Sequence, residues 1–427
     1  MINETTTPDR VTPASSAGAP AGHAGLVQQL EAHGQRRRAD DAQRSLHPRE
    51  STGKHIHLDG RTFVNLAGND YLGFATHPAL KAAAVAATQK HGTGSSASRL
   101  ITGTLPIHLD LERRFAEFKH GPAALLFSSG TAANMGVLLT LARPGDLILQ
   151  DKLNHACLID GARFCGAKVR TFPHRNYEKL ERLLQAAPTE TRQYGRRRTD
   201  KPLDGPTRTF ITTDSVFSME GTTADLPRLL DLCDKYHATL LIDEAHGTGV
   251  LGEHGTGLAE HQGVAGQVHI TVSTASKALG SLGGIVTADE PIIDELINHA
   301  RTFVYTTSLP PAIPASIHAA LDLLRDEPHH RYRLAEIVRR VRGGLRDAGW
   351  DIDHEPTPIV PLVVGPNDAA LALSLKLREA GFLAAAIRPP TVPPNAARVR
   401  LSLRADLTDE ECDTLIRACT NARGLVA

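Results

Sequence analysis

Short apolar runs alternate with helix-like segments through the middle of the chain. Seven of these runs are rich in leucine and β-branched residues, as buried strands are, and they lie at residues 123–127, 146–150, 168–172, 208–214, 239–243, 269–274 and 284–288. The segments between them space apolar residues at helical intervals, as Leu226, Leu229 and Leu230 show. Continuous apolar strands that alternate with helices predict an α/β fold with a mostly parallel seven-stranded sheet covered on both faces. Such a sheet places its ligand site at the carboxyl ends of its strands.

The two ends of the chain differ from this middle region. Residues 1–24 are rich in Thr, Pro, Ser, Ala and Gly without apolar periodicity, which is typical of a disordered tail. A surface helix is predicted from Leu26, and residues 54–66 are predicted to form a β-hairpin. After residue 308 the pattern changes to helices and short strands, with a final helix from Thr408. We therefore expect a tail at 1–24, a helix with small strands at 25–65, a large domain at 66–308 and a smaller α+β domain at 309–427.

Charge and composition narrow the classes of function. The 47 Lys and Arg residues balance 47 Asp and Glu residues, which argues against a sequence-independent nucleic-acid binder or a protein of anionic membranes. The arginine runs at 36–38 and 196–198 are expected to be solvated, the second within an exposed loop at 189–206. No apolar run approaches the ~18 residues of a membrane span, and the N-terminus lacks the layout of a signal peptide.

The cysteines indicate the compartment. There are five, an odd number, and none forms a C-x-x-C pair. This pattern predicts neither a disulfide framework nor a zinc knuckle, and it fits a reducing cytoplasm. We identify no metal ligand set in the sequence.

A lysine follows one of the predicted strand ends. Lys277 comes after the strand 269–274 within the segment TASKALGSLGG, so small neighbours would let a flat ligand approach its amine. A partly desolvated lysine has a lowered pKa and readily forms Schiff bases. A surface lysine in a turn is the competing interpretation of the same letters.

An acidic residue ends the strand 239–243. A buried carboxylate such as that of Asp243 needs a cationic partner, and a protonated pyridine nitrogen is one. A helix-capping Asp243 followed by a structural His246 is the alternative. Residues 247–252 also match G-x-G-x-x-G, but the dinucleotide fingerprint requires the glycines at the strand-to-helix turn itself, and no helix pattern follows here. A dinucleotide site is therefore disfavoured.

Two further features lie at strand ends. Gly130 and Thr131 connect the strand 123–127 to a helix, and backbone N–H groups at such a helix start bind phosphate, although ordinary capping explains the same residues. His155 follows the strand 146–150, where an imidazole could stack on a flat ring or be structural. Together with the lysine and the acid, these are the parts of a pyridoxal 5′-phosphate site. Lys277 lies 34 residues after Asp243, which leaves room for one further helix and strand between them.

At the level of motifs, the chain resembles the α-oxoamine synthases, pyridoxal-phosphate enzymes of fold type I. The resemblance covers about residues 26–423. The segments that carry it are NDYLG at 69–73, GTGSSASRLITGT at 92–104, His155, TTDSVFSMEG at 212–221, DEAH at 243–246 and SKALG at 276–280.

This resemblance implies a role for each matching residue. Lys277 would be the Schiff-base lysine and later the general base, Asp243 the partner of the pyridinium nitrogen, and His155 the residue stacked on the ring. The other implied positions are Ser218 and His246 near the phenolic oxygen, Gly130, Thr131 and Thr274 at the phosphate, and Arg44, Asn69, Arg388 and Thr391 at the substrate. Thr131 stands where the family commonly has an aromatic residue, so the contact near the phosphate or the acyl chain is expected to differ.

Two segments indicate the substrates. Residues 303–311 and 386–393 are similar to the alanine-using branch of the family that acts in biotin synthesis. The resemblance therefore implies decarboxylative condensation of L-alanine with a pimeloyl thioester of coenzyme A or acyl carrier protein. It also implies a homodimer in which Thr306, Thr307 and Ser308 of one copy approach the phosphate bound by the other.

Other functions remain open from the sequence. A family member of the same chemistry could use glycine or serine in place of alanine, with a shorter or longer acyl group. A homologue without activity could serve as a binding subunit, although the intact lysine, aspartate and histidine set argues against this.

Overall fold

The computed structural model describes residues 21–39, 46, 48, 53–58, 60–187 and 207–424. The chain divides into two compact units, Met1–Arg49 and Glu50–Ala427. In the first unit the described element is helix α1, Ala21–Ala39. It begins before the predicted Leu26, so the last four residues of the expected tail at 1–24 are helical. The rest of that tail, Arg44 and the expected loop at 189–206 lie outside the described residues.

Seven strands form the central sheet of the second unit, in the order β3-β9-β8-β7-β6-β4-β5. They are β3 (Ala123–Phe127), β4 (Leu147–Asp151), β5 (Lys168–Phe172), β6 (Thr209–Asp214), β7 (Ala238–Asp243), β8 (Ile270–Thr274) and β9 (Gly284–Ala288). All neighbours from β5 to β8 pair in parallel, and β9 is antiparallel to both β8 and β3. The predicted mostly parallel seven-stranded sheet is confirmed, with strand ends that differ by at most one residue.

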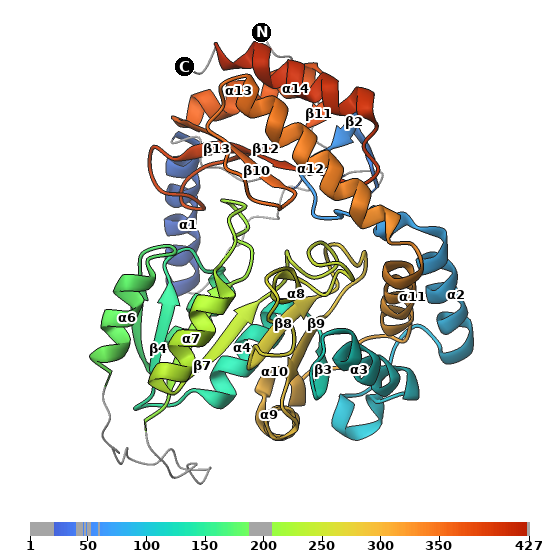
Figure 1. Cartoon of the computed structure of the whole chain (residues 1–427), viewed down its shortest axis with the longest axis vertical. Helices are drawn as coiled ribbons and strands as arrows, with labels where there is room; N and C mark the ends of the chain where they lie inside the picture. Colours follow the sequence, from blue (N-terminus) through green and yellow to red (C-terminus); the bar gives the residue numbers. More distant parts are fainter. Residues whose placement is uncertain are drawn as a thin grey trace. The chain divides into compact units, whose positions relative to one another are not determined.

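Helices cover both faces of this sheet (Figure 1). In β3, Leu125 packs in one apolar cluster with α4, α5 and α9, whereas its neighbour Leu126 packs in another with α3, α6 and α7. The same alternation separates Leu241 from Leu240 and Ile242 in β7, because successive side chains of a strand point to opposite faces. These helices are α3 (Pro106–Phe118), α4 (Gly130–Leu141), α5 (Ala156–Phe164), α6 (Tyr177–Gln185), α7 (Leu226–Tyr236) and α9 (Glu290–His299).

Two small sheets accompany the central one. The predicted hairpin is present as β1 (His55–Leu58) and β2 (Arg61–Asn65), and β2 also pairs in parallel with β11 (Phe382–Leu383). The other small sheet has the order β10-β13-β12. Its strands are β10 (Ile359–Gly365), β12 (Ala385–Ile387) and β13 (Ala397–Ser402). Figure 1 shows β2, in blue, close to the last helix of the chain, in red.

The remaining helices complete the second unit. The longer ones are α2 (Pro78–His91), α11 (Ala312–Asp326), α12 (His329–Asp347), α13 (Asn367–Glu379) and α14 (Asp409–Arg423). The short ones are η1 (Phe74–Thr76), the π-helix η2 (Arg99–Gly103), α8 (Leu258–His261) and α10 (Arg301–Val304). The final helix is capped by Thr408, as predicted. None of the helices among the described residues is long and apolar enough to cross a membrane. The division of the chain at residue 308 stays a prediction.

Candidate functional site

The carboxyl ends of the parallel strands bring the predicted Asp243, Thr274 and Lys277 to one edge of the central sheet, together with Asp214, which the sequence interpretation did not single out. Asp214, Asp243 and Thr274 are the last residues of β6, β7 and β8, three neighbouring strands. Lys277 follows β8, and Gly130 begins α4 just after β3. This is the edge at which an open α/β sheet binds its ligand.

Asp243 is a buried carboxylate with neutral partners. Its side chain is 8% exposed. Asn134 Nδ2 donates to Oδ2 at 2.7 Å, and the backbone N–H of Ala245 donates to Oδ1 at 2.9 Å. No ion pair among the described residues includes Asp243. A buried carboxylate held by neutral donors alone is suited to a cationic group of a ligand.

A second carboxyl group lies beside it. Asp214 pairs with Asp243 in the register of β6 and β7 and accepts the backbone N–H of His155 at 3.2 Å. Burial raises the pKa of Asp214 well above 3.8, and the neighbouring charge of Asp243 adds to the rise. Two adjacent buried carboxyl groups do not both ionise readily, so the charged form of Asp214 is disfavoured in this position.

Lys277 projects from the segment between β8 and β9 and is half-buried. Burial lowers the pKa of its amine below 10.5, while Asp243 and Asp214 act in the opposite direction. The amine forms no hydrogen bond or ion pair with another described residue. A lysine in this state reaches its neutral, nucleophilic form at lower pH than a surface lysine does.

His246 faces the same group of residues. It is 7% exposed, and its Nδ1 lies 2.6 Å from the hydroxyl of Tyr71. Burial lowers the pKa of His246 well below 6.5, and the nearby Lys277 and Arg400 charges lower it further. Burial also raises the pKa of Tyr71 to about 12. At neutral pH this pair therefore consists of a neutral imidazole and a protonated phenol.

Arg400 is a site residue that the sequence interpretation missed. It lies on β13 and is 6% exposed. Its Nη2 donates to Asn69 Oδ1 at 3.0 Å and to the Tyr71 hydroxyl at 3.3 Å, both neutral acceptors, and its Nε has no partner among the described residues. A buried guanidinium without a carboxylate partner is suited to an anionic substrate group. The signal in the sequence was Arg398 and Arg400 at alternate positions of an otherwise apolar strand.

The start of α4 forms a cradle with the end of β8. A Cβ atom added to Gly130 would lie 3.5 Å from Thr274 Cβ and 3.6 Å from its Oγ1, so the Gly130 backbone lies close to the Thr274 side chain. Ser129 caps the helix by accepting the N–H of Ala132 at 3.1 Å. Thr131, in the first turn, is exposed. The N-terminus of a helix attracts an anionic group, so this cradle is suited to a phosphate.

His155 lies near this site without a demonstrated stacking partner. Its ring is exposed and caps α5, where Nδ1 accepts the N–H of Cys157 at 3.3 Å and lies 2.9 Å from its Sγ. Its charge contributes to the lowered pKa of His246, which places the two imidazoles within electrostatic reach of each other. The role of His155 in stacking stays a prediction.

The other predicted residues lie elsewhere. Ser218 is half-buried in the turn that follows β6. Thr306, Thr307 and Ser308 line a small cavity with Arg99 and His108, and Ser308 Oγ lies 3.3 Å from His108 Nε2. Arg388 and Thr391 occupy the segment after β12, where the Thr391 N–H donates to the Arg388 carbonyl at 3.1 Å. The roles predicted for these residues stay predictions.

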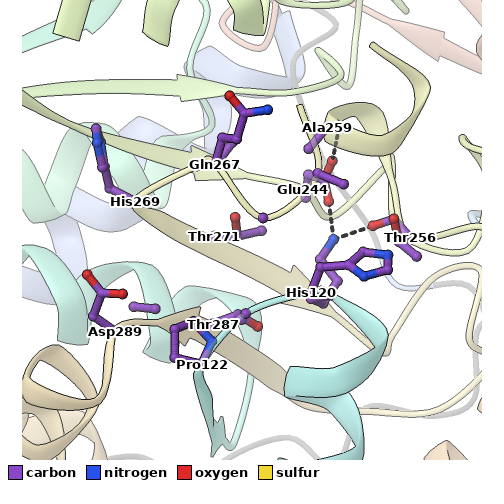
Figure 2. Close-up of a pocket in the computed structure, with 16 residues that line it drawn as sticks. His120, Pro122, Glu244, Thr256, Ala259, Gln267, His269, Thr271, Thr287 and Asp289 are labelled. Carbon is purple, nitrogen blue, oxygen red and sulfur yellow. Dashed lines mark hydrogen bonds and ion pairs between the residues drawn. The ribbon is translucent and has the colours of Figure 1, made fainter. Parts of the chain in front are cut away.

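A separate cavity of about 230 Å³ lies beside the residue that follows Asp243 (Figure 2). Glu244 is fully buried there, forms an ion pair with Lys119, and accepts the backbone N–H groups of Leu258 at 2.5 Å and Ala259 at 3.3 Å. The Lys119 amine also donates to the Thr256 carbonyl. Lys277 does not line this cavity. We therefore place the candidate active site at the charged groups around Lys277 and Asp243, outside this cavity. The contacts of Glu244 hold the segment after β7 in place.

Comparisons with known proteins show the family of the chain. The sequence profile of the aminotransferase class I and II family matches residues 61–418, and the chain belongs to that family. Among its curated relatives, the 8-amino-7-oxononanoate synthase of Geobacter sulfurreducens is 43% identical over 86% of this chain and 90% of the relative.

Solved structures agree with this placement. A serine palmitoyltransferase variant from S. paucimobilis with bound pyridoxal phosphate has a TM-score of 0.84 at 26% identity and covers 94% of this chain and 98% of its own. An 8-amino-7-oxononanoate synthase from Francisella tularensis has a TM-score of 0.71 at 28% identity, with coverage of 85% and 98%. The resemblance stated from the sequence and the fold type I assignment are confirmed.

Proposed function

We propose that this chain is a pyridoxal-phosphate-dependent acyltransferase that condenses L-alanine with a pimeloyl thioester and releases 8-amino-7-oxononanoate, carbon dioxide and the free thiol. The identity of more than 40% with a synthase of this reaction, over nearly the whole of both chains, supports the substrate assignment. The observation that carries the chemistry is the placement of the half-buried Lys277 amine near the unpaired buried carboxylate of Asp243.

The residues of the site fit pyridoxal phosphate. Its pyridinium nitrogen would supply the cation that the Asp243 carboxylate lacks, and its phosphate would accept N–H groups at the Gly130 end of α4. The Lys277 amine would provide the covalent attachment. When bound, the cofactor supplies an electron sink that stabilises negative charge at the carbon next to the amino group.

The protein groups then have separate tasks. Asp243 keeps the ring nitrogen protonated, and the Asn134 and Ala245 donors hold the carboxylate in position for this. Lys277, whose pKa burial lowers, removes the α-proton of the amino acid as a neutral amine and later returns a proton. The neutral His246 and the protonated Tyr71 offer hydrogen bonds without adding charge beside the amine.

Two arginines are candidates for the carboxylate of the amino acid. Arg400 is buried, bonded to neutral groups and close enough for its charge to lower the pKa of Lys277. Arg388 is the residue that the resemblance implied. A guanidinium can bind a carboxylate through two parallel hydrogen bonds, so either residue can orient alanine. The position beside Lys277 favours Arg400 for this role and leaves Arg388 for the acyl substrate.

We also propose that the enzyme is a homodimer. The segment of Thr306, Thr307 and Ser308 would then approach the phosphate bound by a second copy, as the family resemblance implies. The same resemblance leaves coenzyme A and acyl carrier protein as alternative thiol carriers. All five cysteines are free and buried, which suits the reducing cytoplasm predicted from the sequence.

A product assay tests this function. The purified protein is incubated with pyridoxal phosphate, each of alanine, glycine and serine, and each of pimeloyl, acetyl and palmitoyl thioesters, and products are identified by mass spectrometry. We expect the largest kcat/KM for alanine with the pimeloyl thioester. A preference for serine with a palmitoyl thioester, or for glycine with a short acyl group, would overturn the substrate assignment. Absence of every product would favour a binding subunit.

A further inference from the structure

Two histidines and a glutamate from three elements meet on the surface of the second unit. His77 caps the N-terminus of α2, Glu327 follows the last residue of α11, and His330 lies in the first turn of α12. One ligand atom from each lies within 4.8 Å of the other two, and all three side chains are half-buried. Figure 1 shows α11 beside α2, which explains how residues 250 positions apart meet.

The geometry of this cluster is close to that of a tetrahedral metal site. His330 Nε2 lies 3.3 Å from Glu327 Oε2. Bond lengths of about 2.0–2.1 Å to zinc separate neighbouring ligand atoms by about 3.3 Å in a tetrahedron. Two of the ligands are therefore already at the required separation. The third, from His77, has to approach by at most about 1.5 Å, within reach of a half-buried side chain.

The sequence and the surroundings favour a metal over a chance cluster. Glu327 and His330 lie three residues apart across the connection between α11 and α12, so the chain itself holds these two side chains close together. The fully buried ring of Phe74 contacts both imidazoles, with centroids 5.2 Å from His330 and 6.0 Å from His77. An apolar residue behind the ligands limits access of water.

We propose that His77, Glu327 and His330 bind a divalent metal ion of the zinc type. Two imidazoles and one carboxylate are a ligand set typical of zinc, whereas magnesium selects oxygen ligands. The ion would fasten the N-terminus of α2 to the connection between α11 and α12. This site is independent of the function proposed above, because none of its ligands belongs to the group of residues around Lys277.

Metal binding changes the local hydrogen bonding at His77. Its Nδ1 now accepts the backbone N–H of Ala79 at 3.3 Å. A bound ring either coordinates through Nδ1 or carries its proton there, so in both cases this contact ends. The metal bond thus replaces a long hydrogen bond. This provides a matched variant, because Asn in place of His77 keeps a good N-cap while it removes the imidazole.

The test uses the full chain loaded with pyridoxal phosphate. Zinc binding is measured by equilibrium dialysis against micromolar Zn²⁺ with an excess of Mg²⁺, and Tm is measured with Zn²⁺ and with EDTA. We expect one zinc per chain and a higher Tm with Zn²⁺. His77→Asn and His330→Gln should each weaken zinc binding by at least about tenfold, while His77→Asn keeps the Tm of the wild type in EDTA.

His254→Gln is the control variant. His254 forms a comparable pair with Glu260, at 2.6 Å, but no third ligand among the described residues completes that pair. Zinc binding should be unchanged in this variant. The proposal is overturned if the wild type binds no zinc under these conditions. It is equally overturned if His77→Asn and His330→Gln still bind one zinc with the affinity of the wild type, because the ion then lies elsewhere.

Discussion

Replacing Asp243 by asparagine tests the electrostatic basis of the site. The substitution keeps the shape of the side chain and removes its charge. Both oxygens of Asp243 accept hydrogen bonds, one from Asn134 Nδ2 and the other from the backbone N–H of Ala245. The NH2 group of the new asparagine would replace one of these oxygens and would therefore face a donor. Asn134 can turn its amide, because its own Oδ1 has no partner among the described residues. We therefore expect the free energy of unfolding to change by about 1 kcal/mol or less, the value of one neutral hydrogen bond.

The expected effect on catalysis is much larger. A neutral amide cannot hold the pyridine nitrogen in its protonated form, and loss of a preorganised charged partner costs about 2–4 kcal/mol in the transition state. At about 1.36 kcal/mol for each factor of ten, Asp243→Asn should lower kcat/KM by about 30- to 900-fold. The assay is steady-state kinetics at saturating cofactor, with occupancy checked by absorbance.

Asp214→Asn is the matched control. Asp214 is the neighbouring carboxyl group in the register, and burial together with Asp243 raises its pKa well above 3.8. Because burial disfavours the charged form of Asp214, an amide is a milder change here than at Asp243, and kcat/KM should fall less than about tenfold. Equal losses in the two variants, or near-normal turnover of Asp243→Asn at full occupancy, would refute the reasoning.

Three further predictions concern charges around the site. Lys119→Met leaves the buried Glu244 carboxylate without its cation and should lower the free energy of unfolding by about 3–5 kcal/mol, measured by urea titration. Arg400→Lys should raise the KM for alanine at least about tenfold with little change in cofactor affinity. Arg388→Lys should mainly raise the KM for the thioester. If each variant instead raised the other KM, the roles proposed for the two arginines would be exchanged. The pKa of His246 is held below 6.5 in the folded state, so the unfolded state takes up an additional proton as the pH falls below 6.5, and the free energy of unfolding decreases. His246→Gln should lessen this decrease between pH 6.5 and 5. An unchanged dependence of the free energy of unfolding on pH would contradict the assignment.

The sheet and its strand ends could be predicted from the sequence for a physical reason. Six of the seven central strands are largely buried and read as short runs of leucine and β-branched residues, and polar residues at or after the ends of these runs marked the ligand-binding edge. The seventh, the edge strand β5, is largely exposed. Lys277 and Asp243 were found in this way. The two-residue β11 and the three-residue β12 were missed because so few residues carry no periodicity.

The supporting contacts could not be predicted, because they depend on tertiary packing. Asn134 lies on α4 and reaches Asp243 across the sheet edge, 109 residues away in sequence. Arg400 joins Asn69 and Tyr71 from the far end of the chain. The spacing of apolar residues within a single segment contains no information on contacts between distant segments. The family resemblance named Asn69 but not the arginine that binds it.

The most direct test of the account is the site of covalent cofactor attachment. The protein is loaded with pyridoxal phosphate, reduced with borohydride and digested, and the labelled peptide is sequenced by mass spectrometry. We predict a single pyridoxyl group on Lys277, in the peptide that contains TASKALG, and no stable label in Lys277→Ala. A label on any other lysine, or none at saturating cofactor, would contradict the site described here.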